Sequence, residues 1–106
     1  MKKKAFQQGD VLFKKVETVK GKEVKPDARG YVFAEGETTG HYHAVKDTAA
    51  VKVYEENGVK YVRVLKDFAI VEHQEHGAVT LPKGDFKIGI VKEYDPFEKD
   101  IRRVQD

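Results

Sequence analysis

The sequence contains no cysteine, no serine and no tryptophan, and it has a single methionine. Without cysteine, neither a disulfide nor a thiolate-held zinc ion can stabilise the fold. The absence of both serine and cysteine also excludes the common nucleophile arrangements, including the Gly-x-Ser-x-Gly turn. Any hydrolytic chemistry would therefore need a water molecule activated by a metal ion.

Neither an excess of one charge nor a long apolar run is present. Twenty Lys and Arg residues balance 18 Asp and Glu residues, which leaves a formal net charge of +2. That balance argues against a nucleic-acid or polyanion partner, which normally faces a concentrated basic surface. No apolar run approaches the roughly 20 residues of a membrane helix, and no apolar signal core follows the N-terminus. We therefore expect a cytoplasmic protein without a membrane partner.

The 106 residues are predicted to form a single domain with one hydrophobic core. Charged residues make up 36% of the chain, more than the usual quarter or so. Lysine and glutamate dominate, whereas methionine and asparagine occur once each, as Met1 and Asn57. This bias is typical of ion-pair-rich proteins from thermophiles, so a thermophilic source is a hypothesis that a melting temperature would test.

Alternating polarity and turn residues predict about eight short strands and no long amphipathic helix. A tight turn is expected at 82–85, and Gly89 inside the last strand suggests a bulge or a close backbone approach. The pattern predicts an all-β domain, either a small barrel or a sandwich. The expected strands cover residues 10–16, 31–34, 41–46, 51–56, 59–64, 68–72, 79–81 and 86–94, and the polar surface segment 17–30 can hold a weak strand at 19–24.

The strongest local signal is a hairpin centred on Asn57-Gly58. These two residues favour a type I′ turn, which joins two antiparallel strands through a two-residue loop. The turn sets the register, with valines on one face and an aromatic pair on the other. The expected pairs are Val51 with Val64, Lys52 with Arg63, Val53 with Val62, Tyr54 with Tyr61, Glu55 with Lys60 and Glu56 with Val59.

The two ends of the chain differ from this β pattern. Residues 1–8 are expected to form a flexible N-terminal segment. In the segment 95–106, Asp95 can cap a helix that has Pro96 at its first position, and Phe97, Ile101 and Val104 would then share one face. This segment is predicted to form a short helix over the open end of the barrel or sheet, or an arm that packs on a second subunit of a homo-oligomer.

All four histidines lie in two short clusters. His41 and His43 follow a glycine-containing stretch, and His73 and His76 flank Glu75. Alternate residues of a strand share a face at a spacing of about 6.5–7 Å, so the rings of His41 and His43 can converge on one ion. Imidazole suits zinc and iron, and a carboxylate often completes the ligand set. We therefore expect the two clusters to meet in one site.

The predicted metal ligands are His41, His43 and His76, and the predicted metal is zinc or iron. His73 and Glu75 serve as a fourth ligand or as an acid–base pair, and a small-molecule ligand is then expected at the site. Other interpretations stay open. The histidines can be polar surface residues, can bond to the backbone, or can form a metal-free site that binds an anion.

The spacing of Gly36, His41 and His43 resembles the first motif of the cupin barrels, and the run from Gly77 to Pro82-x-Gly84 resembles the start of the second. The likeness implies a metal-binding barrel, with Asp47 near the position of the carboxylate ligand. The chain departs from the family because residues 85–87 contain no histidine. The resemblance then implies that His76 or His73 supplies the third histidine.

A second set of motifs covers most of the chain and consists of Gln8-Gly9-Asp10-Val11, Ala34 to Glu37, Thr39-Gly40-His41-x-His43, His73-x-Glu75-His76, Leu81-Pro82-x-Gly84, Glu93-Tyr94-x-Pro96 and Ile101 to Val104. Together these motifs resemble a family of small bacterial and phage proteins without an assigned activity. This second resemblance implies that the two histidine clusters act as a unit, but it implies no chemistry. The alternative function is therefore a non-enzymatic accessory protein in which the histidines are structural.

Overall fold

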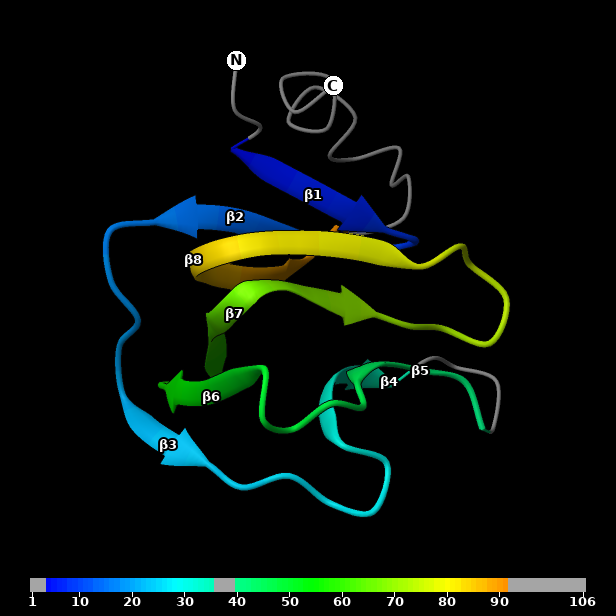
Figure 1. The fold of residues 1–106 in the computed structure, drawn as a ribbon, viewed down its shortest axis with the longest axis horizontal. Helices are drawn as coiled ribbons and strands as arrows, with labels where there is room; N and C mark the ends of the chain where they lie inside the picture. The colour runs from blue at the N-terminus through cyan, green and yellow to red at the C-terminus, as the bar shows by residue number, and fades with distance from the viewer. Residues whose placement is uncertain (1–3, 36–39, 92–106) are drawn as a thin grey trace, which may run out of the picture.

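The computed structural model describes residues 4–35 and 40–91, and these residues form two antiparallel β-sheets (Figure 1). The larger sheet has six strands in the order β1-β2-β8-β7-β6-β3, and the smaller sheet pairs β4 with β5. The all-β prediction is confirmed in its sandwich form, because no closed barrel is found in the described part of the chain. The strands are β1 (Ala5–Gln8), β2 (Val11–Val16), β3 (Lys22–Val24), β4 (Tyr31–Glu35), β5 (Tyr42–Val45), β6 (Val51–Glu56), β7 (Val59–Val71) and β8 (Val79–Ile90).

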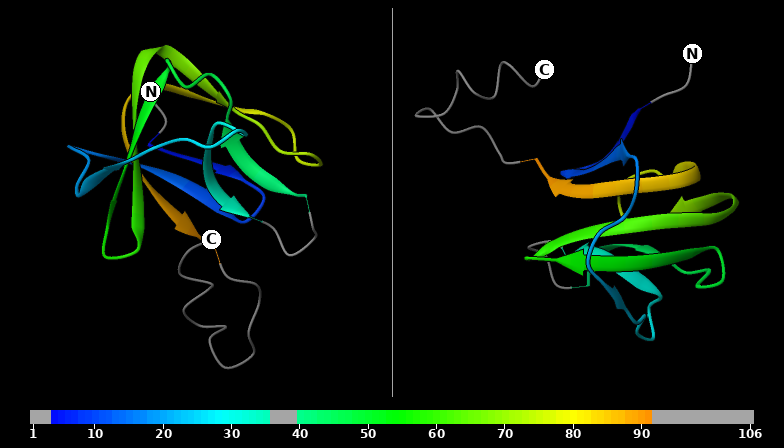
Figure 2. Two further views of the ribbon diagram at one scale, coloured as in Figure 1. Left: turned by 90° about the horizontal axis from the view of Figure 1, so that it is seen from below. Right: turned by 90° about the vertical axis from the view of Figure 1, so that its left-hand side faces the viewer.

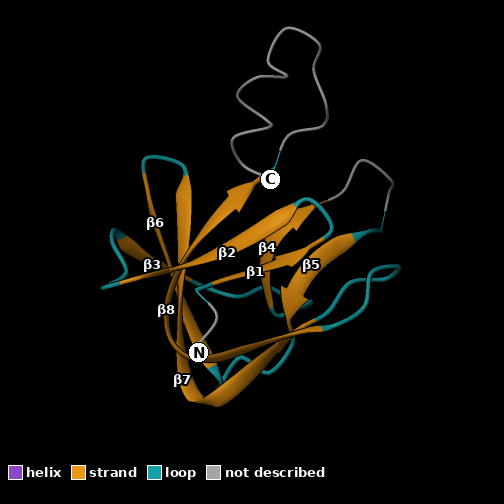
Figure 3. Ribbon diagram, turned by 90° about the horizontal axis from the view of Figure 1, so that it is seen from above, coloured by secondary structure: helices purple, strands orange, loops and turns teal. Residues whose placement is uncertain are grey.

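The long strands β7 and β8 bend, so the larger sheet curves around the core (Figures 2 and 3). The β4–β5 hairpin lies across from β2, where Phe33 meets Phe13 edge to face with ring centroids 5.4 Å apart. One isolated bridge, between Ala44 and Glu72, joins β5 to the chain just after β7. The sandwich is therefore tied together at the end where β7 stops.

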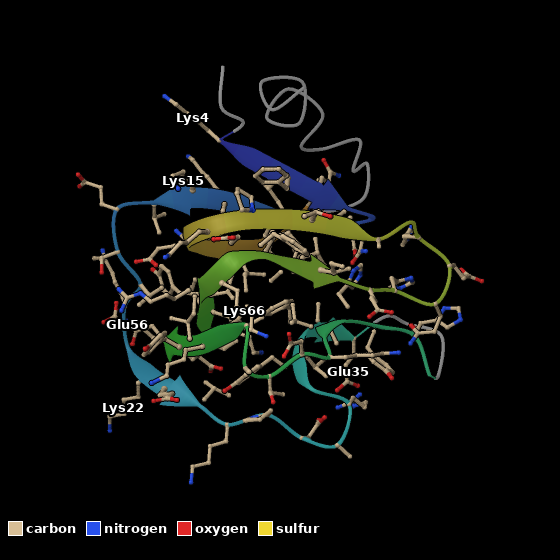
Figure 4. All side chains as sticks on the ribbon, in the orientation of Figure 1. Lys4, Lys15, Lys22, Glu35, Glu56 and Lys66 are labelled. Atoms are coloured by element: carbon tan, nitrogen blue, oxygen red, sulfur yellow. The ribbon has the colours of Figure 1, made fainter. Side chains whose placement is uncertain are left out.

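The core between the sheets is built mainly from valines and phenylalanines. Along β6 and in residues 86–88 of β8, buried side chains alternate with exposed or half-exposed ones, as expected for strands with one buried face. Charged side chains such as Lys4, Lys22 and Glu56 are exposed and extend away from the strands (Figure 4). The fully buried core side chains include Val11, Phe13, Val53, Val62, Val71, Leu81 and Phe86.

The hairpin around Asn57-Gly58 has the predicted register. All six predicted residue pairs between β6 and β7 are observed, and both turn residues have positive φ, 51° and 80°. Glu55 forms the expected ion pair with Lys60 at 3.9 Å. Arg63 avoids the like charge of Lys52 by pairing with Asp85 on the neighbouring strand.

The predicted turn at 82–85 is wrong, because β8 continues through it as a strand. Proline lacks an N–H donor and is tolerated where only one side of a strand is paired. Pro82 meets this condition, because it pairs with Phe68 of β7 whereas the pairing with β2 begins only at Asp85. The irregularity lies instead in β7, whose register shifts between Val64 and Phe68.

The expected bulge or close approach at Gly89 is also wrong. Gly89 pairs in regular register with Leu12, and no atom lies within 4 Å of the position of a Cβ there.

At the N-terminus, the structure adds strand β1, which sequence patterning does not predict within residues 1–8. The predicted C-terminal helix or arm at 95–106 lies outside the described residues. No helix in the described ranges could span a membrane.

Candidate functional site

The structure brings the four histidines together. His43 lies in β5 and His41 immediately precedes this strand, whereas His73 and His76 lie in the loop between β7 and β8. The His43 and His73 ring centroids are 4.4 Å apart, those of His73 and His76 are 4.6 Å apart, and those of His41 and His73 are 5.6 Å apart. In Figure 1 the start of β5, the β7–β8 loop and the turn between β1 and β2 lie on the same side of the molecule.

His43 is the buried member of this cluster, with 2% of its surface exposed. Its Nδ1 lies 2.8 Å from Oε1 of Gln8, which is equally buried. The Gln8 amide nitrogen donates to the carbonyls of Val71 and Gly77, both at 2.9 Å, so the orientation of this amide is determined. Because Gln8 Oε1 can only accept, His43 Nδ1 must carry the hydrogen. The neutral His43 ring therefore presents an unprotonated Nε2.

The Nε2 atom of His43 faces a carboxylate. It lies 3.5 Å from Oδ1 of Asp10, which is longer than the roughly 2.7–2.9 Å of a charge-assisted hydrogen bond. Burial lowers the pKa of His43 below its ordinary value of 6.5, the nearby His73 and His76 lower it further, and Asp10 opposes the change. Near neutral pH, a ring lone pair and a carboxylate oxygen therefore face each other.

His73 has the opposite arrangement of protons. Its Nδ1 accepts the backbone N–H groups of Glu75 at 3.0 Å and His76 at 3.2 Å, so its proton resides on Nε2. Burial lowers the pKa of His73, and the neighbouring His76 and His41 act in the same direction. In this conformation His73 stabilises the loop and offers an N–H donor rather than a lone pair for a metal ion.

His76 packs directly on the turn between β1 and β2. A Cβ atom on Gly9 would lie 2.6 Å from His76 Nε2, and Gly9 has a φ of 58°. Both facts favour glycine at this position, because a side chain would strain the turn and would displace the imidazole ring. His76 Nε2 therefore lies against Gly9, the residue that precedes Asp10.

His41 and Glu75 form the solvent side of the cluster. His41 Nδ1 lies 3.8 Å from Glu75 Oε1, and the Glu75 side chain is 70% exposed. The neighbouring Gln74 accepts the backbone N–H of Tyr42 at 2.7 Å, which ties the β7–β8 loop to β5. The predicted acid–base pair, His73 and Glu75, is thus divided between an inner and an outer position.

The separation of the His43 and His76 rings is one that two histidines bound to the same ion can have. With metal–nitrogen bonds of about 2.1 Å, two ligands at angles of 90–180° have ring centroids about 4.5–6.4 Å apart. The His43 and His76 rings are stacked at 6.2 Å, within this range. However, within residues 4–35 and 40–91 no three His, Asp or Glu side chains already form a group that could hold a metal ion. Metal binding would therefore require side-chain rotations, which the exposed His76 and Asp10 can make.

Sequence patterning missed the contribution of Gln8 and Asp10. The run Gln8-Gly9-Asp10-Val11 carried part of the second resemblance, and that was the available signal. The carboxylate suggested by the cupin likeness, Asp47, instead accepts from Lys66 at 2.9 Å and from the Ala49 N–H.

Comparison with known proteins supplies a family. A family model described as a domain of unknown function, DUF8820, matches residues 7–90, a range that includes all four histidines, Gln8 and Asp10. No curated protein and no solved structure matches the chain.

Proposed function

The chain belongs to the DUF8820 family, and on that premise we propose that its histidine cluster binds a divalent transition-metal ion, zinc or iron. One observation carries the proposal. The buried His43 is held by Gln8 in the tautomer that leaves Nε2 unprotonated, and this atom faces the Asp10 carboxylate at 3.5 Å. Histidines that ligate metals commonly donate their other N–H to an oxygen acceptor in the same manner.

A metal ion between His43 Nε2 and the Asp10 carboxylate would stabilise this contact better than a proton would. Burial and two neighbouring histidines lower the pKa of His43, so the protonated ring is disfavoured near neutral pH. A divalent cation needs neutral imidazole and ionised carboxylate, which are the forms that this environment favours. The buried ring is therefore better prepared to accept a metal ion than a proton.

His41, His43 and His76 are the proposed ligands, and His73 and Glu75 are the proposed acid–base groups. His76 is exposed and His41 is partly exposed, so both can turn toward His43 at little cost in packing. Three protein ligands leave a coordination position for water, which zinc makes more acidic. In that case a small-molecule ligand would approach from the side of Glu75.

The test is metal analysis and titration of protein purified without a histidine tag. We expect stoichiometric zinc or iron, or tight binding of added zinc by the metal-free protein, in wild type. His76→Gln and His41→Gln should each weaken binding by at least about tenfold, because each removes one ligand. Both positions are accessible to solvent, so the variants should keep the fold.

Glu72→Gln provides the control, since its exposed side chain lies at the start of the same loop and pairs with Lys46 rather than with a histidine. Its zinc affinity should stay within about twofold of wild type. Wild-type protein that takes up no zinc or iron at micromolar concentration would contradict the proposal. Unchanged affinity in both histidine variants would contradict the proposed ligands.

A further inference from the structure

We infer that the last residue of β1 and the turn after it, Gln8-Gly9-Asp10, form the other half of this metal site, with Asp10 as the carboxylate ligand beside His43 and His76. This inference rests on the proposed function and names a ligand and a positioning residue that neither histidine cluster contains. Gln8 acts through His43 and is a positioning residue, whereas Asp10 would touch the metal itself.

The separation of Asp10 and His43 suits a shared ion. Two donor atoms bonded to one metal at about 2.1 Å, at angles of 90–120°, lie about 3.0–3.6 Å apart. The observed distance between His43 Nε2 and Asp10 Oδ1, 3.5 Å, falls in this range. For a direct hydrogen bond the same distance is at the weak limit.

The Asp10 backbone is fixed while its carboxylate is free to move. The Asp10 carbonyl accepts the N–H of Val91 at 2.7 Å, and the next residue, Val11, pairs with Ile90 of β8. The Asp10 side chain is 56% exposed, and within the described ranges His43 is the only residue with which it forms an ion pair. A small rotation of the side chain can therefore adjust the carboxylate to a metal ion without moving the turn.

Gly9 and His76 bring the third ligand to the same place. The His76 Nε2 atom occupies the space that a Cβ on Gly9 would need. Its ring is nearly parallel to that of His43, with an interplanar angle of 14°. Both imidazoles therefore lie against the β1–β2 turn, His43 beside Asp10 and His76 beside Gly9. Together with His41, these groups would supply three imidazoles and one carboxylate, which fill a tetrahedral zinc site or leave open positions on a six-coordinate iron(II) ion.

The experiment is a titration of metal-free protein with Co²⁺, followed by its visible absorption, in wild type, Asp10→Asn and Asp47→Asn. Asp47 is the matched control, because its carboxylate is also 56% exposed but pairs with Lys66. We expect Asp10→Asn to weaken Co²⁺ binding by about 10- to 100-fold and to change the cobalt spectrum. Asp47→Asn should bind within about twofold of wild type with the same spectrum.

The folding of the metal-free proteins separates a ligand from a merely structural residue. Without metal, Asp10→Asn should be at least as stable as wild type, because an amide N–H can donate to His43 Nε2 where the carboxylate cannot. Equal Co²⁺ affinity and equal spectra in wild type and Asp10→Asn would overturn the inference and leave the proposed function standing. A wild-type protein that binds no Co²⁺ would overturn both.

Discussion

Two polar networks cross the strands of this protein, and they differ in how completely their groups are paired. In one, Asp85 of β8 accepts from Nε and Nη2 of Arg63 on β7, both at 3.0 Å. The same carboxylate accepts the backbone N–H of Val19 at 3.1 Å, and Arg63 reaches Thr18 at 3.4 Å. Opposite charges in bidentate geometry thus hold the segment between β2 and β3 against the sheet.

The other network, formed by Gln8, His43 and Asp10, is complete on only one side. Gln8 uses both ends of its amide, but beyond His43 a ring lone pair faces a carboxylate at 3.5 Å. The first network is therefore complete in itself, whereas the second is the one at which we propose that a cation binds.

The largest expected effect comes from Gln8→Leu, which should destabilise metal-free protein by about 2–4 kcal/mol. The substitution leaves the carbonyls of Val71 and Gly77 and the Nδ1–H of His43 without their partner. Urea denaturation in the presence of a chelator measures the change. Gln7→Leu is the control, because Gln7 is exposed, and it should alter stability by less than about 0.5 kcal/mol. Similar stabilities of the two variants would contradict the role of Gln8.

An intermediate effect is expected for Asp85→Ala, about 1–3 kcal/mol of lost stability. The Asp85 side chain is 11% exposed and accepts three hydrogen bonds, including one from the backbone of Val19. Asp67→Ala, at an exposed position, is the control and should change stability little. Added zinc should stabilise Asp85→Ala by as much as it stabilises wild type, since Asp85 is no part of the histidine cluster. A smaller gain in stability on adding zinc in Asp85→Ala than in wild type would contradict the independence of the two networks.

The smallest effect concerns pH. The pKa of His43 is lowered in the folded protein from its ordinary value of 6.5, so the unfolded chain binds the proton first as the pH falls. Stability of the metal-free protein should therefore be highest above about pH 6.5 and should decline as the pH falls through 6.5 toward the lower folded pKa. His73, whose pKa is also lowered, contributes in the same direction. The decline should be modest, because Asp10 opposes the shift of His43.

Urea denaturation of chelator-treated protein between about pH 7.5 and 5.5 measures this slope. His43→Gln should reduce the slope, whereas Asp85→Ala should leave it unchanged because no histidine contacts Arg63 or Asp85 among the described residues. Stability that rises toward pH 5.5 in wild type would contradict the assignment of a neutral His43.

Local features of the fold were predictable where the relevant interactions are short in sequence. The Asn57-Gly58 turn determines the register of β6 and β7, because a two-residue loop allows one alignment of its flanking strands. The turn predicted around Pro82 failed because pairing with β7 outweighs the local preference of proline and glycine. Strand β1 was missed for a related reason, since its pairing with β2 and the burial of Gln8 depend on distant parts of the chain.

For the histidine site, the sequence by itself determined the residue types and the two clusters, whereas the strand face expected to be shared by His41 and His43 is not formed because β5 begins only at Tyr42. Only the tertiary structure decided that Gln8 and Asp10 belong to the same site and that His73 has its proton on Nε2. Gln8 and His43 are 35 residues apart, and Gln8 and Gly77 are 69 apart. Such contacts depend on how the sheets close around the core, and no local pattern of residues encodes them.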